Sequence, residues 1–188
     1  MSKKVIPNPS RPIFPTPAGL ITSADSDGKP NIITLGEVAM VSLRPTRVSV
    51  GARPATYSNG LIKASGEYVI NFPTADMAEV VDICGTVSGR KVDKFAETGL
   101  TPEPAIHVKA PLIKECPVNL ECKVIGVLSL GSHDLFIGDV LVMHAEEEIL
   151  LNDERGTVDP SNGLIFAMGA YWRFGEKIEN AHFVKRRS

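Results

Sequence analysis

A loop of small residues that runs into basic ones, residues 84–95, has the composition of an anion-binding site. Gly85 and Gly89 permit backbone conformations that are closed to other residues, and Ser88 adds a hydroxyl beside free N–H groups. Three cations follow within one or two helical turns: Arg90, Lys91 and Lys94. Such a loop can wrap an anion, and it can equally be a solvated turn before a surface helix.

A second candidate anion site lies at residues 51–57, where a predicted strand ends and a predicted helix begins. Helix N-termini present unpaired N–H groups and a partial positive charge, and the planar fork of Arg53 suits a phosphate group. Thr56 adds a hydroxyl in the first turn. The alternative is that Thr56 is only a helix cap and Arg53 only a surface charge. Together, the two stretches form two candidate anion cradles.

Polar side chains also stand on predicted strands: Asn31 and Thr34 on one, Ser49 on its neighbour and Asn71 on a fourth. Asparagine is disfavoured in strands, so Asn31 and Asn71 require a reason to be there. Either they contact a ligand, or they lie at strand-end turns and bulges. The second explanation suits Asn71, which directly precedes Phe72 and a proline.

Metal binding and side-chain nucleophiles have no support in the sequence. His133 falls in a predicted hairpin connection, where an exposed turn residue is the alternative to a site residue. The other histidines and the three cysteines show no metal-ligand spacing: His107, His144, His182, Cys84, Cys116 and Cys122. There is no Gly-x-Ser-x-Gly elbow, Walker A loop, Gly-x-Gly-x-x-Gly after a strand, or His-Glu-x-x-His. We therefore expect no catalytic side chain and no metal.

The elements that must position these groups are mainly strands. Alternating patterns and turn residues predict strands at 19–24, 31–41, 47–51, 67–72, 118–128 and 134–145, and a last apolar, aromatic segment at 164–174. Helices are predicted at 54–64, 74–84 and 92–99. Three strands with short loops before residue 52 favour an antiparallel meander or barrel. The prediction is a mainly β fold, a β-barrel with inserted helices.

The chain divides into three parts by composition. Residues 1–17 carry five prolines and predict an extended N-terminal arm, because proline removes a donor and fixes φ. Residues 18–175 form one predicted domain, and residues 176–188 form a C-terminal tail. The length of 188 residues is typical of a single domain that buries roughly 70% of its unfolded surface.

Composition excludes some functions and compartments. A formal net charge of −2 gives no overall attraction to nucleic acid or to an anionic membrane, so anion binding must be local. The N-terminal residues lack an apolar signal core, and no apolar run approaches membrane-spanning length. We expect a cytoplasmic protein with no nucleic-acid or membrane partner.

The order of short motifs along the chain resembles the flavin reductase-like family, and within it the flavoredoxin branch. The resemblance spans roughly residues 15 to 175. It rests on Pro17-x-Gly19-Leu20-Ile21-Thr22, Asp27-Gly28-Lys29-Pro30-Asn31, Arg53-x-x-Thr56-Tyr57, Glu67-Tyr68-Val69-Ile70-Asn71, Ser88-Gly89-x-x-x-Asp93-Lys94-Phe95, Leu120-Glu121-Cys122-Lys123 and His133-x-Leu135-Phe136-Ile137-Gly138-Asp139-Val140.

This resemblance implies a split β-barrel that binds FMN, usually as a homodimer with the flavin near the subunit interface. Asn31 and Thr34 would contact the flavin ring or ribityl chain, and Arg53 and Thr56 would hold the phosphate. Lys94 would reach the same cofactor from the loop at 84–95. The full set of expected cofactor-binding residues is Asn31, Thr34, Ala52, Arg53, Thr56, Asn71, Ser88, Lys94, His133 and Tyr171.

The sequence departs from the family after the Asn31 strand. Flavoredoxins tend to place an aromatic residue, and sometimes a cysteine, where this chain has Glu37 and Val41. A carboxylate near a flavin disfavours the anionic reduced ring, so Glu37 is expected to lower the flavin potential. Cys84 is expected to be a packing thiol at a helix end.

Three functions follow as hypotheses. The first is an FMN-dependent oxidoreductase that reduces flavin with NAD(P)H or passes electrons to a partner protein; the cofactor would supply the redox chemistry. The second is a flavin-binding electron carrier without its own substrate site. The third is a barrel that has lost FMN and serves as a binding module. A homodimer is expected because a half-open barrel leaves apolar edges that need cover.

Overall fold

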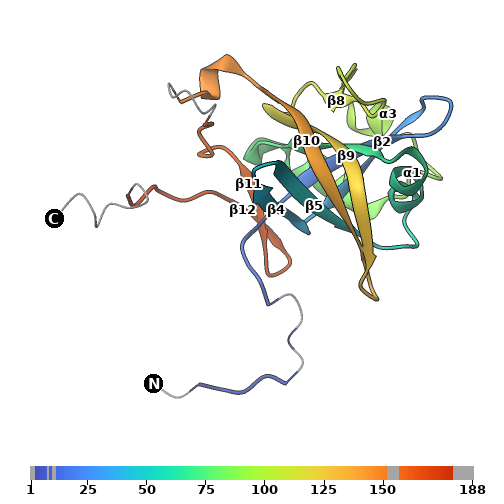
Figure 1. Ribbon diagram of the computed structural model, residues 1–188. Coiled ribbons are helices and arrows are strands. Elements are labelled where there is room, and N and C mark those ends of the chain that lie inside the picture. The colour runs from blue at the N-terminus through green and yellow to red at the C-terminus, as the bar shows by residue number, and fades with distance from the viewer. Residues whose placement is uncertain (1–2, 8, 10–11, 152–156, 180–188) are drawn as a thin grey trace.

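The central sheet of the computed structural model is antiparallel and consists of hairpins joined edge to edge (Figure 1). The structure describes residues 3–7, 9, 12–151 and 157–179. Its seven strands run in the order β3-β2-β6-β9-β10-β5-β4. Their bounds are β2 Gly19–Ala24, β3 Pro30–Leu35, β4 Val38–Leu43, β5 Thr46–Ala52, β6 Glu67–Phe72, β9 Val118–Ser129 and β10 Asp134–Ala145.

Smaller elements cover this sheet. A three-stranded sheet has the order β1-β11-β12, and β7 pairs with β8. Their bounds are β1 Thr16–Pro17, β11 Leu164–Ala167, β12 Ala170–Arg173, β7 Pro102–Glu103 and β8 Leu112–Ile113. The helices are α1 Tyr57–Ser65, α2 Ala78–Thr86 and α3 Lys94–Thr98, with 3-10 turns η1 Ala75–Met77 and η2 Glu147–Ile149.

Most predicted elements are present, with four revised boundaries. The predicted strand 31–41 is two strands, β3 and β4, separated at residues 36–37. The helix predicted at 54–64 begins at Tyr57, because Thr56 is the N-cap. The helix predicted at 74–84 begins with η1 and continues as α2 to Thr86, so the first residues of the expected loop are helical. The aromatic segment 164–174 folds back on itself as the hairpin β11–β12.

Two hydrophobic clusters hold these layers together. One fills the barrel, where Tyr68 and Phe136 are its largest fully buried side chains. The other joins α2 and α3 to β2 and β3 through residues that include Val81, Cys84, Phe95 and Leu20. Burying large apolar side chains is the main stabilising term of such a fold. The second cluster fixes the two helices against the face of the sheet that carries the candidate site.

The N-terminal arm leaves the body of the protein as an extended segment (Figure 1). Of the arm's described residues, the last two join a sheet, where Thr16 pairs with Phe166 and Pro17 with Ile165. Apolar side chains on the arm are largely exposed: Val5, Ile6, Ile13 and Phe14. Of the predicted C-terminal tail, residues 176–179 form no helix or strand, and residues 180–188, including His182, lie outside the described residues.

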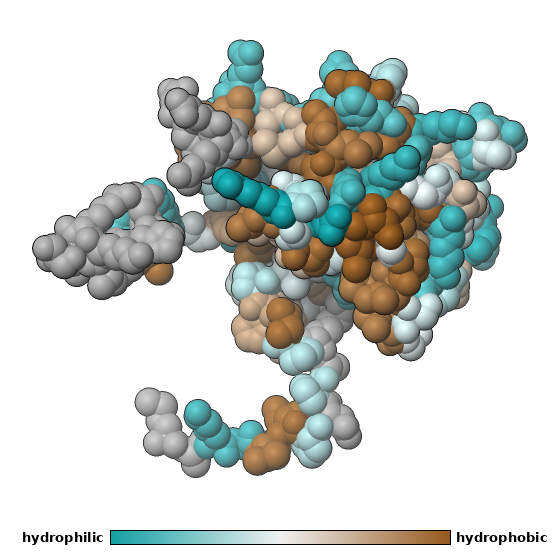
Figure 2. All heavy atoms as spheres, in the orientation of Figure 1, coloured by the Kyte–Doolittle hydropathy of each residue, from teal (hydrophilic) through white to brown (hydrophobic). Residues whose placement is uncertain are grey.

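Exposed apolar side chains are frequent on β4, β9 and β10. Figure 2 shows hydrophobic residues gathered on the face where β9 and β10 lie. The exposed members on β4, β9, β10 and the turn between the last two are Met40, Val41, Leu43, Ile125, Val127, Leu128, Leu130, Leu141 and Met143. Val127 pairs with Phe136 of the barrel core, whereas the next residue, Leu128, pairs with Leu135, so these side chains lie on both faces of the sheet. Exposed apolar surface of this extent marks an interaction surface. Within the described ranges, no helix is both long and apolar enough to span a bilayer.

Candidate functional site

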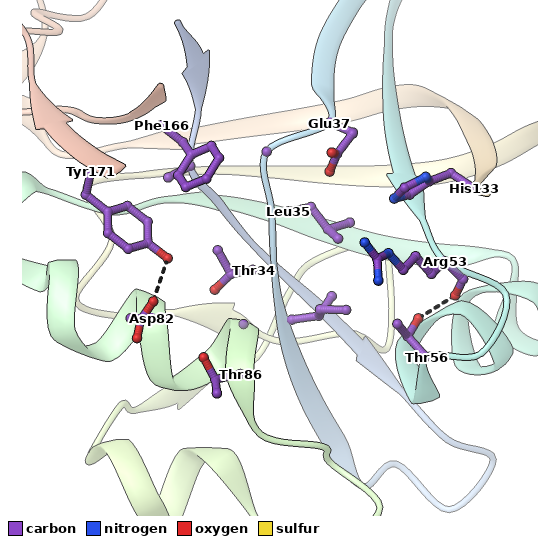
Figure 3. Close-up of a pocket in the computed structure, with 14 residues that line it drawn as sticks. Thr34, Leu35, Glu37, Arg53, Thr56, Asp82, Thr86, His133, Phe166 and Tyr171 are labelled. Atoms are coloured by element: carbon purple, nitrogen blue, oxygen red, sulfur yellow. Dashed lines mark hydrogen bonds between the residues drawn. The ribbon is translucent and has the colours of Figure 1, made fainter. Parts of the chain in front are cut away.

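The candidate site is a pocket of about 440 Å³ between the end of β3, the β5–α1 junction, the last turns of α2 and the β11–β12 hairpin (Figure 3). It brings together residues that the sequence places up to 153 positions apart, from Ala18 to Tyr171. Five of the ten predicted cofactor-binding residues line it: Thr34, Arg53, Thr56, His133 and Tyr171. Its remaining walls include Glu37, Asp82, Thr86 and Phe166.

A second pocket, of about 310 Å³, adjoins the first. The two share Ile33, Arg53, Thr56, Gly85 and Thr86, so they adjoin as two parts of one cleft. Three further predicted residues line this part: Asn31, Ser88 and Lys94. Both volumes lie within the range typical of small-molecule sites, about 300 to 1,000 Å³.

The start of α1 forms one wall of the cleft. Thr56 is the N-cap residue: its hydroxyl donates to the Arg53 carbonyl at 2.8 Å and accepts from the Asn59 N–H at 3.3 Å. The first turn carries no acidic residue. The Arg53 guanidinium points into the pocket in Figure 3, and it has no hydrogen bond or ion pair with the described residues. An unpaired guanidinium beside a helix N-terminus is suited to an anion such as a phosphate.

The loop after α2 lies close to this wall because its glycines permit it. A Cβ added at Gly89 would stand 1.8 Å from Asn31 Oδ1, so no larger residue fits there without moving Asn31. Asn31 in turn donates from Nδ2 to Ser58 Oγ at 2.7 Å. Arg90 closes the approach by donating to the Ala55 carbonyl at 3.1 Å and lying over the Tyr57 ring. The two candidate cradles are therefore parts of one site.

Lys94 lies differently from what the sequence suggests. Its side chain is buried, and its ammonium donates to the carbonyls of Ile32 at 2.7 Å and Cys84 at 2.6 Å. Burial lowers the pKa of Lys94 from its usual value, while the neighbouring Cys84 opposes this shift. An ammonium has three donors, so one remains for the cleft that Lys94 lines. Its evident structural role is to join the last turn of α2 to the edge strand β3.

Cys84 is a buried thiol in the last turn of α2. Burial raises its pKa to about 11, and the nearby Lys94 ammonium opposes the shift. A thiol with a raised pKa carries little of the nucleophilic thiolate at neutral pH. Cys84 is a packing residue of the second core cluster, as the sequence suggests.

Two aromatic rings form the far wall of the first pocket. Phe166 and Tyr171 meet edge to face, with ring centroids 5.5 Å apart. The Tyr171 hydroxyl donates to Asp82 at 3.2 Å, and burial together with Asp82 raises the pKa of Tyr171 to about 12. Figure 3 shows this hydrogen bond across the pocket from Arg53. Sequence reasoning named Tyr171 but missed Phe166, its partner across the hairpin.

Polar groups complete the rim. Thr34 donates its hydroxyl to the Val81 carbonyl of α2, which fixes β3 against the helix. His133 lines the pocket from the β9–β10 connection, and its Nδ1 lies 2.9 Å from Ser132 Oγ. Glu37 lies at the break between β3 and β4, exposed at the pocket wall. Across residues 3–7, 9, 12–151 and 157–179, His, Cys, Asp and Glu side chains form no cluster able to hold a metal ion.

Two predicted residues are not brought to the cleft. Asn71 is fully buried; it donates to the Leu20 carbonyl at 2.9 Å and accepts from the Ile113 N–H and from Asn119 Nδ2. It therefore connects β6 to the 111–119 segment, and its prediction as a cofactor contact has no geometric support. Ala52 is buried in the barrel core, where its carbonyl accepts from Asn59 Nδ2 at 3.1 Å.

Asp134, at the start of β10, holds α1 in place through hydrogen bonds. Its carboxylate accepts hydrogen bonds from Lys63 Nζ at 2.7 Å, Asn59 Nδ2 at 2.9 Å and Ser129 Oγ at 2.7 Å. The Lys63 hydrogen bond first, then those from Ser129 and Asn59, lower the pKa of Asp134 to about 2. Sequence reasoning missed this group, because its partners lie 75 and 71 residues away along the chain.

This arrangement predicts a pH-dependent stability that Asp134→Asn removes. The folded pKa of about 2 lies below the unfolded value of about 3.9, so the unfolded state binds more protons between them. The stabilisation is present above about pH 4 and is lost as the pH falls toward 2. In thermal unfolding, the difference between wild type and Asp134→Asn should shrink over this interval. Lys63→Met should behave similarly; a difference that stays constant with pH in both variants would contradict the prediction.

The comparisons with known proteins decide the family. The model of the flavin reductase like domain matches residues 10–171. The chain belongs to the flavin reductase-like family. Flavoredoxin of Desulfovibrio vulgaris (Miyazaki F) is similar in structure, with a TM-score of 0.89 and 31% identity over 97% of this chain and 100% of that chain. This confirms the predicted family and its split-barrel fold.

Relatives that are similar in sequence support the same family. An uncharacterized protein of Archaeoglobus fulgidus is 37% identical over 135 residues, 71% of this chain and 75% of the relative. NADH:riboflavin 5'-phosphate oxidoreductase of Streptomyces pristinaespiralis is 28% identical over 123 residues, 65% of this chain and 67% of the relative. The family associates this chain with flavin-linked oxidation and reduction or electron transfer.

Proposed function

We propose that this protein binds FMN in the cleft and serves as a flavoprotein oxidoreductase that uses NAD(P)H or passes electrons to a partner protein. The observation that carries the proposal is the Arg53 guanidinium at the N-terminus of α1, which pairs with none of the described residues and faces the same cleft as the Phe166–Tyr171 pair. The first group suits a phosphate, and the second suits a planar ring. FMN carries both chemical features in one molecule.

The residues of the cleft fit this cofactor. Arg53, Thr56 and the first turn of α1 would hold the phosphate, with Ser88 on the facing loop. Thr34 and Tyr171 would border the ring. Bound FMN would supply the hydride and electron chemistry, which agrees with the lack of a catalytic motif in the sequence. The chain itself binds and orients the cofactor, excludes water and sets the charge around it.

Relatives support the finer assignment. The name of the Streptomyces pristinaespiralis relative, NADH:riboflavin 5'-phosphate oxidoreductase, specifies FMN and a nicotinamide donor. Flavoredoxin, which is 31% identical to this chain, favours the alternative of an electron carrier without its own substrate site. The two functions share one cofactor site and differ in whether a nicotinamide reacts there.

Rapid mixing of the FMN-loaded protein with NADH or NADPH separates these alternatives. Prompt bleaching of the flavin absorbance supports the reductase, and an unreactive flavin that accepts electrons from a reduced protein supports the carrier. A purified chain that shows no flavin absorbance, even after FMN is added, would leave only the third hypothesis, a barrel that serves as a binding module. The absorbance spectrum with and without NAD(P)H therefore tests the proposal.

Glu37 is expected to lower the flavin potential, because a carboxylate at the pocket wall disfavours the anionic reduced ring. In Glu37→Gln, the midpoint potential of bound FMN should rise by about 20 mV or more, as expected for an exposed carboxylate within several ångströms. Spectroelectrochemical titration measures this shift. Glu148→Gln, which neutralises an exposed carboxylate in η2, is the matched control and should leave the potential unchanged. An unchanged potential in Glu37→Gln would refute the role of Glu37.

We also propose that the protein forms a homodimer through the exposed apolar patch on β4, β9 and β10. These side chains are exposed, and Figure 2 shows apolar residues gathered where β9 and β10 lie. Burying such a surface favours a symmetric pair of identical patches. Sedimentation at micromolar concentration should show a dimer, and a monomer under these conditions would count against it.

A further inference from the structure

An apolar pocket of about 330 Å³ adjoins the candidate flavin site. The two share Gly36, Glu37 and Phe166 as a common wall. The rest of its lining comes from β4, β5 and β10, from the N-terminal arm and from the β11–β12 turn: Pro12, Ile13, Thr16, Val38, Ala39, Ser49, Leu135 and Met168. An apolar pocket with few polar groups is typical of a small-molecule site.

One hydroxyl in this pocket is available to a ligand. Ser49 is 96% buried, since only 4% of its surface is exposed, and within the described part of the chain nothing hydrogen-bonds to its hydroxyl. Its neighbours across the sheet, Ala39 and Ile137, offer no side-chain acceptor. Among the described residues, the buried side-chain atoms without a partner are Ser23 Oγ and Tyr68 Oη. Ser49 Oγ is instead accessible from the pocket, so it can donate to a ligand with an acceptor oxygen.

Met168 points to the same pocket through its backbone. Met168 and Gly169 connect β11 to β12, and both have positive φ, 52° and 85°, which is the pattern of a type I′ turn. Asparagine is favoured at the first of these positions, whereas methionine is strained there. Turn chemistry therefore does not explain Met168. Its flexible, polarisable side chain, at the mouth of the pocket, suits contact with aromatic rings of varied shape.

The lining of the pocket favours an uncharged ligand. Its walls are apolar, so a charged ligand would lose its hydration without compensation. Glu37, on the shared wall, repels anions in addition. A neutral planar ring compound with a carbonyl oxygen meets all of these conditions: an apolar body, one acceptor for Ser49 and a face for Phe166 and Met168.

We propose that this pocket binds an uncharged planar carbonyl compound of the quinone class beside the flavin site, with Ser49 as its hydrogen-bond donor and Met168 and Ile13 as its cover. The functional significance of this location rests on the proposed FMN-dependent function, because the proposal places an electron acceptor against the wall shared with the FMN cleft. The binding of the quinone itself requires no cofactor, so the two ideas are tested separately.

Trp172 provides the readout. It is the single tryptophan of the sequence, and its indole N–H donates to the Ala167 carbonyl at 3.3 Å, next to Met168. Duroquinone is neutral, does not add readily to thiols and quenches indole fluorescence. Titrating it into the full-length chain, with and without saturating FMN, should give saturable quenching in both cases. FMN binding is measured independently from the flavin absorbance, so a chain that binds FMN but not duroquinone overturns this proposal alone.

Variants identify the site. Ser49→Ala should weaken duroquinone binding about three- to tenfold, as expected for one neutral hydrogen bond, and Ser42→Ala on the neighbouring strand should not. Ile13→Ser should weaken binding about threefold or more, whereas Ile6→Ser, farther along the arm, should have no effect. Equal effects of Ser49→Ala and Ser42→Ala would place the quinone elsewhere and overturn the assignment.

Met168→Asn distinguishes a ligand-binding role of Met168 from a purely structural one. It should raise the midpoint of thermal unfolding by about 2 °C, because asparagine suits the turn, and should weaken duroquinone binding about threefold or more. A variant that is more stable and binds duroquinone equally well overturns the role of Met168.

The anionic analogue 1,4-naphthoquinone-2-sulfonate should bind at least tenfold more weakly than duroquinone, and Glu37→Gln should narrow that gap. Equal affinities of the two quinones for the wild type would contradict the charge argument. If Met168→Asn shifts the sedimentation of the protein but leaves its affinity for duroquinone unchanged, the pocket is a contact between copies of the chain, and the proposal is overturned.

Discussion

Replacing Arg53 by alanine is expected to weaken FMN binding by about 10- to 100-fold. The guanidinium is the one group at the start of α1 that combines a full positive charge, a free fork of donors and a position in the cleft. Charge-assisted hydrogen bonds to phosphate contribute about 1.5 to 3 kcal/mol, which corresponds to this loss of affinity. Titration of FMN fluorescence with the apoprotein measures it directly.

The control for Arg53→Ala is Lys123→Ala, which removes the same charge from an exposed position on β9 that lines neither part of the cleft. It should leave the affinity for FMN unchanged. Affinity should also fall with added salt in the wild type, and this dependence should be weaker in Arg53→Ala because one ionic contact is missing. A loss of less than threefold would show that the phosphate lies elsewhere, or that the cleft binds another molecule.

Lys94→Met is expected to lower both stability and FMN affinity. It leaves the carbonyls of Ile32 and Cys84 without their buried donor. Losing a buried partner costs about 1 to 3 kcal/mol for each unsatisfied group, so the midpoint of thermal unfolding should fall by several degrees. Because the end of α2 and the following loop form one side of the cleft, FMN affinity should fall about tenfold or more.

Lys91→Met is the matched control, since Lys91 is an exposed lysine of the same loop and lines neither pocket. Unfolding curves and FMN titrations of both variants distinguish two roles for Lys94. Loss of stability together with affinity supports positioning through the two carbonyls. Loss of affinity at unchanged stability would support the direct cofactor contact that the sequence suggests. An unchanged FMN affinity would remove this loop from the cofactor site.

Local signals explain why so much of the fold follows from the sequence. The long hairpin of β9 and β10 is predicted from its alternation, because one face of a sheet is buried and side chains point to opposite faces in turn. Thr56 and Gly99 mark helix ends, the first through its side-chain cap and the second through a left-handed backbone. Each of these signals depends on residues only a few positions apart.

The site depends less on such signals. Arg53 and Thr56 are predictable, because a cap and its neighbouring cation are adjacent in the sequence. Phe166 is not, since it acquires its role only when the segment 164–174 folds back and places it against Tyr171. Asp134 is likewise recognisable only once Asn59 and Lys63 of α1 lie beside it.

The sequence by itself determined the family, the six longer strand segments and three helices in their order, and the two stretches that border the cleft. Only the tertiary structure decided what Lys94 and Asn71 do. Lys94 finds its acceptor at Ile32, 62 residues away, and Asn71 finds its partners at Ile113 and Asn119, 42 and 48 residues away. A buried polar group must be paired wherever the fold brings a partner. That partner is set by packing and not by spacing along the chain.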